Sequence, residues 1–442
     1  MRIQMPQAVK EIIATLQQNH FEAYAVGGCV RDSILGREPN DWDITTSASP
    51  REVKALFRRT IDTGIEHGTV TVMVDKTGYE VTTYRIDGKY EDGRHPTEVT
   101  FTRNLKEDLL RRDFTVNAMA YNDTDGLVDI FGGMEDIKNK VIRCVGDPRA
   151  RFTEDALRLL RAIRFAAQLG YTIEDETRAA MREIAGNLTK ISAERIQVEL
   201  VKTLVSPNPM MLKDAYELGL TKYFMPEFDK AMETEQYNLH HMYTVGIHSL
   251  VATGNIRADK VLRLTMLLHD LGKPLCITTD EDGTRHYYGH PGKSEEIARE
   301  ILHRLKFDND TIRKVCVLVR HHDERIVPGT KYMRRAVARI GEDAFPALFE
   351  VQEADIMAQS EYQREQKLSA LEANRNDYEE IRRLNQCVSK ATLAVTGKDL
   401  IDCGMKPGKE IGRVLDDMLK DVIEEPEHNN KEYLLKKIRS RF

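Results

Sequence analysis

The hydrophobic positions change their period several times along the first 140 residues. Apolar side chains recur at helical spacing over 7–18, and a second helix is expected over 50–57, with Ser49 as its N-cap. Short runs of apolar or alternating residues predict strands, at 23–26, 42–45, 70–74 and 79–84. The last two runs flank a turn and predict a hairpin. This mixture of periods predicts a small α+β domain with an antiparallel or mixed sheet.

From Thr153 onwards the apolar residues keep helical spacing almost to the C-terminus, and few strand signals return. We therefore expect an α+β head followed by an all-α neck, a helical body and a helical tail. The predicted boundaries are 1–140 for the head, 141–205 for the neck, 206–385 for the body and 386–442 for the tail. No apolar run approaches the roughly 20 residues of a membrane span, so no membrane partner is expected.

The composition narrows the class of protein. Of the 442 residues, 41% are hydrophobic and 31% are charged, and the six cysteines form no C-x-x-C pair. This pattern predicts reduced thiols and a cytoplasmic location. A formal net charge of −6 excludes a protein that is basic over its whole surface, so any RNA-binding surface has to be local. Arginines do cluster between 143 and 164, and nine of the thirteen histidines lie between 240 and 322.

Two acids separated by one residue, Asp41 and Asp43, give the first chemical signal. On the predicted strand their side chains point to the same face. Carboxylates this close repel each other unless a cation lies between them, and hard oxygen ligands of this kind suit Mg²⁺. Glu80, on a strand expected nearby, is a candidate third carboxylate, with an exposed strand charge as the alternative.

A glycine pair precedes these acids. Gly27 and Gly28 allow a triphosphate to approach the backbone, and the helix expected after them favours anions at its N-terminus. Arg31, just inside that helix, can bind a phosphate through two hydrogen bonds, and Asp32 is expected to brace it. Glycines next to a metal site predict a nucleoside triphosphate and hence phosphoryl or nucleotidyl transfer.

A second cluster comprises Arg112, Asp113 and Asn117. Asn117 follows Asp113 by four positions, which places both on one face of the helix expected there. The hydroxyls of a ribose need neighbouring donors and acceptors of this kind. The alternative is an ordinary capped helix with Asp113 or Thr115 as its cap.

A third cluster recurs at steps of about three along a helix expected over 153–165. Its charged residues are Glu154, Asp155, Arg158, Arg161 and Arg164. An amphipathic helix with a solvated, salt-bridged face is the alternative. The excess of arginine over lysine favours a binding role, because guanidinium groups suit planar bases and phosphates.

Five motifs in this order resemble the class II tRNA nucleotidyltransferases, that is, the CCA-adding enzymes and their poly(A) polymerase relatives. The motifs are Gly27–Asp32 with Asp41–Asp43, Arg111–Ala118, Asp129–Asp136, Glu154–Arg158 and Glu194–Leu200. The resemblance implies that an RNA 3′-hydroxyl attacks the α-phosphorus of CTP or ATP and that pyrophosphate leaves. It also implies Mg²⁺ at Asp41 and Asp43 and the 3′ end of tRNA as the partner.

The resemblance gives the third cluster a role in choosing the base. Asp155 can accept a hydrogen bond from the exocyclic amine of cytosine or adenine, and Arg158 can donate to an acceptor on the same edge. Such a pair rejects uracil and guanine, which present the opposite pattern. Arg161 and Arg164 would then contact phosphates or the other face of the nucleotide.

The loop over 84–96 resembles the flexible loop that family members need for the final A, which argues against an enzyme that adds only CC. Full CCA addition is favoured. An A-adding enzyme and a poly(A) polymerase remain alternatives, and so does an RNA-binding scaffold without activity.

The histidine-rich middle resembles the HD superfamily, whose helices bind a metal through an H…HD…D pattern. The matching residues are His248, His269, Asp270 and Asp355. Imidazole with carboxylate suits a divalent transition metal or Mg²⁺. The resemblance implies a phosphohydrolase that acts on phosphomonoesters or cyclic phosphates, and a phosphohydrolase regulated by a nucleotide-binding head is a further alternative. A last alternative is that the helices serve only as a body and tRNA platform.

Overall fold

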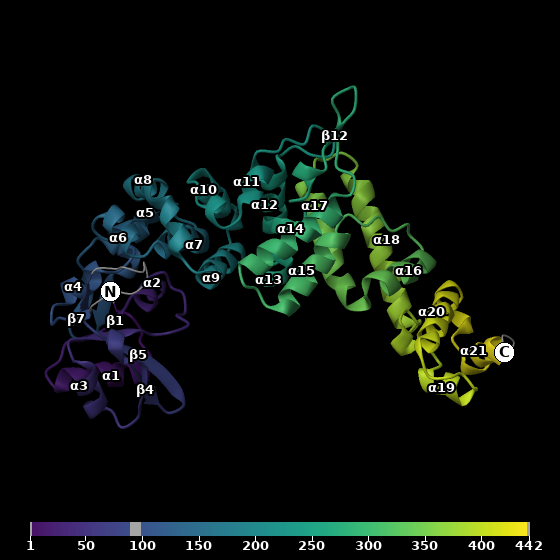
Figure 1. Ribbon diagram of the computed structural model, residues 1–442. Coiled ribbons are helices and arrows are strands. Elements are labelled where there is room, and N and C mark those ends of the chain that lie inside the picture. The colour runs from purple at the N-terminus through teal and green to yellow at the C-terminus, as the bar shows by residue number, and fades with distance from the viewer. Residues whose placement is uncertain (1, 89–98, 440–442) are drawn as a thin grey trace. The chain divides into compact units, whose positions relative to one another are not determined.

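The computed structural model describes residues 2–88 and 99–439, so the greater part of the loop expected over 84–96 lies outside the described residues (Figure 1). The chain divides into two compact units, Met1–Pro226 and Glu227–Phe442. The first unit holds a sheet and flanking helices, and the second is helical apart from one short hairpin. This confirms the expected fold class. The four-part division by residue number stays a prediction.

Within the described residues, the first unit contains a seven-stranded sheet in the order β3-β4-β5-β2-β1-β8-β9. Only β2 and β5 pair in parallel, so the sheet is mixed, which is one of the two arrangements that the sequence predicts. Its strands are β1 (Ala23–Val26), β2 (Ile44–Thr46), β3 (Thr60–Gly64), β4 (Thr69–Val74), β5 (Thr77–Thr83), β8 (Met119–Asn122) and β9 (Gly126–Asp129). Short pairs lie outside it, as β6 (Arg85–Asp87) with β7 (Val99–Phe101) and β10 (Val141–Ile142) with β11 (Thr172–Ile173).

The register gathers three chain segments at one end of this sheet. In the parallel pair of β2 and β5, Asp43 and Glu80 directly precede two residues that lie opposite each other. The end of β1 adjoins the start of β2, and the N–H of Val26 donates to the carbonyl of Asp43 at 3.0 Å. The N–H of Gly27 donates to the carbonyl of Met119, where β8 begins, at 3.1 Å. The glycine pair and the acids therefore meet at one end of the sheet.

The strand expected over 42–45 begins two residues later, at Ile44. Asp41, Trp42 and Asp43 precede the strand and are not part of it. The predicted alternation nevertheless holds, because Trp42 is buried while both acids are exposed.

The helices of the head form where their sequence pattern predicts them. The buried face of α1 consists of Val9, Ile12, Ile13 and Leu16. Ser49 is the N-cap of α3 and forms a capping box with Glu52. The helices are α1 (Gln7–Gln18), α2 (Gly28–Ile34), α3 (Pro50–Leu56), α4 (Leu105–Leu110) and α5 (Gly133–Asn139). Figure 1 shows α1 and α3 side by side, next to β4 and β5.

The neck helices differ from the prediction at one point. The helix expected over 153–165 is interrupted, because α6 ends at Glu154 and α7 begins at Leu157. Asp155 adopts an extended backbone at the end of α6, and its Oδ1 accepts the N–H of Leu157, the first residue of α7, at 3.0 Å. The helices are α6 (Pro148–Glu154), α7 (Leu157–Leu169), α8 (Asp175–Ile184), α9 (Ala193–Leu204) and α10 (Leu212–Glu217).

The buried side chains of the second unit include two clusters. One cluster runs from Ala252 to Val388, and the other comprises residues from Cys387 to Ile438. The helix α18 is long, with 20 residues, and rich in charged side chains. The helices are α11 (Pro226–Met232), which begins at the division between the units, α12 (Val245–Asn255), α13 (Lys260–Leu268), α14 (His290–Arg304), α15 (Asn309–His321), α16 (Thr330–Ile340), α17 (Phe345–Ala358), α18 (Arg364–Arg383), α19 (Gly397–Asp402), α20 (Lys409–Glu424) and α21 (Lys431–Arg439).

A short hairpin of β12 (Thr278–Thr279) and β13 (Arg285–His286) projects from the helical body (Figure 1). Among the described residues, no helix combines the length and the apolar character that crossing a membrane requires. All six cysteines are free thiols, as their scattered positions predict.

Candidate functional site

Charged groups from three segments surround Asp43. Its carboxyl has a raised pKa, first because it is partly withdrawn from water and then because the charges of Asp41 and Glu80 repel its ionised form. Arg112 opposes this shift. The predicted third carboxylate therefore does lie near the pair. Carboxylate oxygens are the ligands that a divalent cation such as Mg²⁺ prefers, although, among the described residues, these three acids do not have the spacing of a metal site in this structure.

The glycine turn lies between two guanidinium groups. Gly27 has a positive φ of 82°, and a Cβ atom there would lie 3.2 Å from Nη1 of Arg112. A Cβ atom on Gly28 would lie 3.7 Å from Nη2 of Arg31. The absence of side chains at this turn leaves both guanidinium groups close to the backbone, which is the arrangement that a polyphosphate requires.

Arg112 is held by Asp108, a residue that the sequence analysis missed. Nη2 of Arg112 lies 3.3 Å from Oδ2 of Asp108, while Arg111 donates twice to Oδ1, at 2.9 and 2.8 Å. Thr45 donates to Oδ2 at 3.1 Å. Burial alone would raise the pKa of this carboxyl, but Arg111 and Arg112 keep it below its usual value. The available signal was the spacing of three and four residues between the acid and the two arginines.

Asp113 and Asn117 are in contact, as their spacing predicts. Nδ2 of Asn117 donates to Oδ1 of Asp113 at 3.2 Å, and Oδ1 of Asn117 accepts from Nη1 of Arg31. The local structure is a 3₁₀ turn over Thr115–Asn117 and not the α-helix expected there. The side chains still meet because Asp113 also accepts the N–H of Phe114 at 2.8 Å, which turns its carboxylate toward the segment.

Arg161 pairs with the same carboxylate. Its Nε and Nη2 donate to Oδ2 of Asp113 at 2.7 and 2.6 Å. Burial raises the pKa of Asp113, but Arg161 and Arg158 outweigh it and lower that pKa to about 2. Both oxygens of Asp113 thus have protein partners, and its proposed contact with a ribose stays a prediction.

The charged residues of the base-choosing motif are held by several neighbours. Nη1 of Arg158 donates to Oε2 of Glu154 at 2.7 Å, and its Nη2 donates to the carbonyl of Arg111 at 2.9 Å. Asp155 does not pair with Arg158 and instead accepts a hydrogen bond from Arg195 of α9, at 2.7 Å. The fifth motif, Glu194–Leu200, thereby holds an acid of the fourth.

The ring of Phe165, on α7, makes cation–π contacts with three arginines. The guanidinium carbons of Arg31, Arg161 and Arg164 lie 5.1, 5.3 and 4.0 Å from its ring centroid. Arg164 also donates from Nε to Glu199, at 2.5 Å, and is buried, which lowers its pKa. Arg164 is thus closely packed inside the protein, while its expected contact with a nucleotide stays a prediction.

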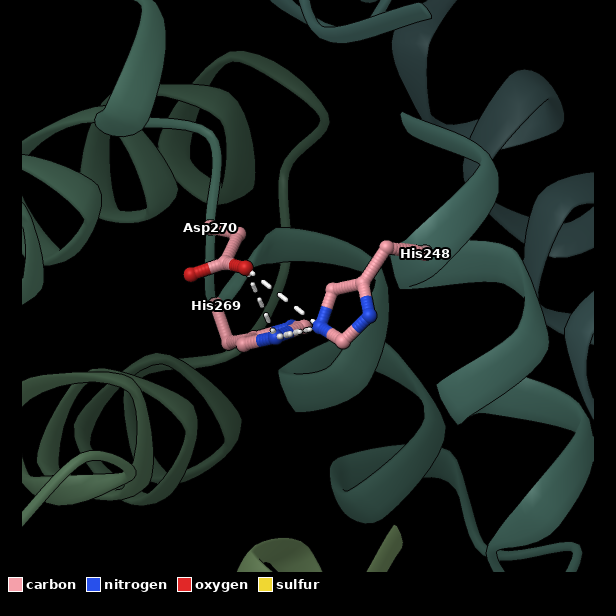
Figure 2. Close-up of side chains that lie close together, drawn as sticks. All are labelled: His248, His269 and Asp270. Carbon is pink, nitrogen blue, oxygen red and sulfur yellow. Dashed lines mark hydrogen bonds and ion pairs between the residues drawn. The ribbon is translucent and has the colours of Figure 1, made fainter. Parts of the chain in front are cut away.

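A second constellation lies in the helical unit. Figure 2 shows His248, His269 and Asp270 with their polar atoms pointing toward one another. The two Nε2 atoms are 3.3 Å apart, and Oδ2 of Asp270 lies 3.3 Å from that of His269 and 3.5 Å from that of His248. Oδ1 of Asp355 lies 2.8 Å from Nε2 of His248. The four predicted residues are therefore brought together, and all are buried.

A further pair of histidines adjoins the other oxygen of Asp270. Nε2 of His290 lies 3.2 Å and Nε2 of His322 lies 3.5 Å from Oδ1 of Asp270. Among the described residues, two groups thus have the spacing of a metal site, and they share Asp270. These two histidines were not among the residues predicted from the sequence as ligands.

Hydrogen bonds made by the Nδ1 atoms fix the orientation of these imidazole rings, whose Nε2 atoms face the carboxylates. Nδ1 of His269 lies 2.7 Å from the carbonyl of Met266, and Nδ1 of His322 lies 2.7 Å from that of Val319. A carbonyl only accepts, so Nδ1 carries the proton and Nε2 of the neutral ring keeps its lone pair. Similar contacts join His290 to Tyr287 at 2.8 Å and His248 to Ala358 at 3.3 Å.

The carboxylates make this pocket strongly attractive to cations. Although burial lowers the pKa of His269, Asp270 and Asp355 raise it to about 10. The ammonium of Lys273 lies 2.6 Å from Oδ2 of Asp270. The inward Nε2 atoms and two buried carboxylates form a donor set that fits divalent transition metals, which would displace the proton of His269 on binding.

Comparisons with known proteins cover most of the chain. Residues 23–143 match the family model described as "Poly A polymerase head domain", and 170–232 match "Probable RNA and SrmB- binding site of polymerase A". A third model, for tRNA nucleotidyltransferase domain 2, matches 290–438.

Full-length relatives agree with these matches. The CCA-adding enzyme of Levilactobacillus brevis is 38% identical over 416 residues, which are 94% of this chain and 92% of that protein. That of Enterococcus faecalis is 36% identical over 441 residues, 98% of this chain and 96% of that protein. The crystal structure of the Bacillus stearothermophilus CCA-adding enzyme in complex with CTP superposes with a TM-score of 0.75 at 30% identity and covers 99% of both chains.

Proposed function

We propose, since the chain belongs to the family of CCA-adding enzymes, that Asp41 and Asp43 are the Mg²⁺ ligands of this RNA nucleotidyltransferase. The enzyme adds C, C and A to the 3′ end of tRNA from CTP and ATP and releases pyrophosphate. The observation that carries the assignment is the charge around Asp43. Neighbouring acids disfavour its ionised form, and a bound cation would relieve that repulsion.

The triphosphate would lie over the glycine turn. Arg31 and Arg112 approach Gly27 and Gly28 from two sides, and each guanidinium can donate two hydrogen bonds to phosphate oxygens. A divalent ion at the acids would favour ionisation of the attacking 3′-hydroxyl and neutralise charge on the leaving pyrophosphate. Asp108 keeps Arg112 in place for this contact.

The incoming base would be chosen by Asp155 and Arg158. A carboxylate accepts from the exocyclic amine that cytosine and adenine share, and a guanidinium donates to the neighbouring ring acceptor. Uracil and guanine would leave buried polar groups unpaired, at a cost of about 1–3 kcal/mol each. Asp155 is presented from the turn between α6 and α7, held by Arg195.

The direct experiment supplies CTP and ATP separately to tRNAs that lack their last three, two or one nucleotides. The chain is expected to extend all three to the same full-length end when both nucleotides are present. Growth only from the tRNA that is one nucleotide short would instead identify an A-adding enzyme, and unlimited A tails would identify a poly(A) polymerase.

The double variant Asp41→Ala with Asp43→Ala tests the metal site. Addition is expected to fall by several orders of magnitude, since the charge on the leaving group is no longer neutralised. Asp62→Ala is the matched control, because Asp62 is an exposed acid of the same head that pairs with Lys54. Activity that survives in the double variant would contradict the assignment.

A second candidate function belongs to the helical unit, where we propose a metal-dependent phosphohydrolase. Its support is the set of four Nε2 atoms around Asp270 and Asp355. His248 and His269 with both acids would hold one ion, and His290 and His322 with Asp270 would hold another. Bound divalent metal would supply a nucleophilic hydroxide and polarise the phosphoryl group.

The test is hydrolysis of uridine 3′-monophosphate, with the metal content measured on the same sample. His269→Ala with Asp270→Ala is expected to remove the bound transition metal and the hydrolysis while leaving nucleotide addition intact. His303→Ala, an exposed histidine on α14, is the control. Wild-type protein that binds no metal after equilibration with Mn²⁺ would rule out this second function.

A further inference from the structure

Asp108, on α4, carries a buried carboxylate next to the nucleotide site. Its exposed fraction is 0%, and it belongs to none of the five motifs that indicate the family. Burial raises the pKa of this carboxyl, but Arg111 and Arg112 outweigh burial and keep it ionised. A charge withdrawn from water in this way depends on its partners, so the groups around Asp108 define what it does.

The two oxygens of Asp108 hold two different arginines. Oδ1 accepts two hydrogen bonds from Arg111, at 2.9 and 2.8 Å, while Oδ2 lies 3.3 Å from Nη2 of Arg112. The two arginines are neighbours in the chain. One carboxylate therefore fixes two successive side chains at the start of the motif Arg111–Ala118.

Thr45 joins this carboxylate to the strand that follows the metal-binding acids. Its Oγ1 lies 3.1 Å from Oδ2 of Asp108, which is the oxygen that also faces Arg112. Thr45 is fully buried in β2, two residues after Asp43. The position of β2 therefore sets where Oδ2 lies, and with it where the guanidinium of Arg112 lies.

Arg112 keeps donor atoms for a ligand. Within the part of the chain that the structure describes, its Nε is buried and has no hydrogen-bond partner. Its Nη1 lies 3.2 Å from the position that a Cβ atom would take on Gly27. Buried donors without a partner are rare in native proteins, and a phosphate oxygen at the glycine turn would supply one here.

The backbone of the same segment contacts the base-choosing motif. The carbonyl of Arg111 accepts a hydrogen bond from Nη2 of Arg158 at 2.9 Å, and the carbonyl of Leu110 accepts one from Nη1 of Arg151 at 3.0 Å. A displacement of Arg111 would therefore move an anchor of Arg158.

We propose that Asp108 is a positioning residue that couples binding of the triphosphate to the choice of base. Oδ2 places Arg112 against the glycine turn, and Oδ1 places Arg111, whose carbonyl supports Arg158. The inference rests on the proposed roles of Arg112 and Arg158 and adds the group that aligns them. Because protein donors occupy both of its oxygens, Asp108 acts through these arginines and not on the nucleotide itself.

Thr45→Val tests the arm that leads to the triphosphate. The substitution removes the hydroxyl that orients Oδ2 and changes neither charge nor volume. Kd for CTP, measured by calorimetry on the full chain with Mg²⁺ and without RNA, is expected to rise by on the order of fivefold, as for one lost hydrogen bond. Kd for CMP should stay unchanged, since CMP lacks the two outer phosphates.

Thr46→Val is the matched control for this substitution. Thr46 is the next residue of β2, is equally buried, and donates its hydroxyl hydrogen to the carbonyl of Glu22 at 2.6 Å. It loses a hydrogen bond of the same kind in the same strand, but away from Asp108. Both Kd values are expected to equal those of the wild type.

Asp108→Asn separates positioning from charge. Removal of a negative charge beside a triphosphate would by itself strengthen CTP binding. The inference predicts the opposite, a rise in Kd for CTP by on the order of tenfold, because Arg112 loses its charged partner. The ratio of CTP to UTP incorporation in single turnovers is expected to fall in this variant and to stay unchanged in Thr45→Val, which leaves the contact of Oδ1 with Arg111.

Several results would overturn the inference. Tighter CTP binding in Asp108→Asn would show that its charge matters and its position does not. An equal loss of CTP and CMP affinity in Thr45→Val would show a general effect on the fold. A weaker grip on CTP with an unchanged CTP to UTP ratio in Asp108→Asn would remove the coupling.

Failure of the proposed function would look different, because it concerns the wild type. Equal Kd values of the wild-type chain for CTP and CMP would show that no group binds the outer phosphates, and the role of Arg112 would be wrong together with this inference. A wild-type preference for CTP that neither Thr45→Val nor Asp108→Asn reduces would leave the triphosphate site standing and contradict the role of Asp108 alone.

Discussion

Arg195 of α9 donates to Oδ2 of Asp155 at 2.7 Å, across 40 residues of sequence. One turn further along the same helix, Glu199 accepts from Arg164 of α7. Two residues of α9 thus hold both ends of the segment that carries the base-choosing motif. The motif Glu194–Leu200 therefore positions Asp155 of the motif Glu154–Arg158.

Replacing this arginine should change the choice of base. In Arg195→Met, Asp155 keeps only its capping contact with the N–H of Leu157, so its second oxygen is free to turn. The ratio of CTP to UTP incorporation is expected to fall by on the order of tenfold, which corresponds to one weakened polar contact. Single-turnover incorporation into tRNA lacking CCA measures it.

Arg149→Met is the matched control for this substitution. Arg149 forms an exposed ion pair with Glu183 at 2.8 Å, and exposed pairs of this kind contribute about 0–1 kcal/mol. An unchanged incorporation ratio in Arg195→Met, with a lower rate for both nucleotides, would show that Arg195 supports the fold of the neck and not base choice.

Gly27→Ala should damage nucleotide addition more than it damages stability. The new Cβ would lie 3.2 Å from Nη1 of Arg112 and force that guanidinium away from the triphosphate position. Gly36→Ala is a close control, since Gly36 also has a positive φ, of 70°, but no atom within 4 Å of a new Cβ. Both variants are expected to lose about 1–2 kcal/mol of stability from backbone strain.

Only Gly27→Ala should raise KM for CTP, by on the order of tenfold for one weakened charged contact. Steady-state kinetics and urea unfolding on the same preparations separate the two effects. Equal KM values in both variants would contradict the role given to Arg112.

Acid should remove the stability that Asp113 contributes. Its pKa in the folded chain is about 2, below its ordinary value of 3.8. A lowered pKa stabilises the fold above pH 3.8, and that contribution disappears as the pH falls through 2. The gap of about 1.8 pKa units corresponds to about 2 kcal/mol.

The free energy of unfolding of wild type and Asp113→Asn is therefore compared at pH 5 and pH 2. The difference between them is expected to shrink by about 2 kcal/mol at the lower pH. A difference that stays constant would mean that the ion pair with Arg161 does not set the pKa of this carboxyl.

Each bound metal ion should add separately to the stability of the helical unit. Mn²⁺ at a hundred times its Kd adds about 2.7 kcal/mol per site when it binds only the folded chain. Scanning fluorimetry with and without EDTA is expected to show a higher melting temperature for wild type with Mn²⁺. His322→Ala should keep part of this gain, because the group of His248, His269 and Asp270 is intact, whereas Asp270→Ala should show none.

Nucleotide addition by Asp270→Ala serves as the control for folding of the first unit. A full Mn²⁺ effect in Asp270→Ala would show that the ion binds elsewhere.

In the head, local sequence patterns predict several elements correctly. The helix at Gln7–Gln18, the strand at Ala23–Val26 and the cap at Ser49 agree with the sequence to the residue, because each depends on neighbours within one or two turns. The helix predicted through Asp155 is interrupted because a single side chain satisfies the next helix's N–H instead. Hydrophobic periodicity does not reveal such a side-chain hydrogen bond, so the break in the helix could not be predicted from it.

The sequence by itself determined the α+β head followed by helices, the motif order that indicates the family and the four residues around His269. Only the tertiary structure decided that Arg195 holds Asp155, and that His290 and His322 share Asp270 with the first pair. These contacts join side chains on different helices and loops. Spacing along a chain fixes which face a residue occupies, but only packing fixes which faces meet.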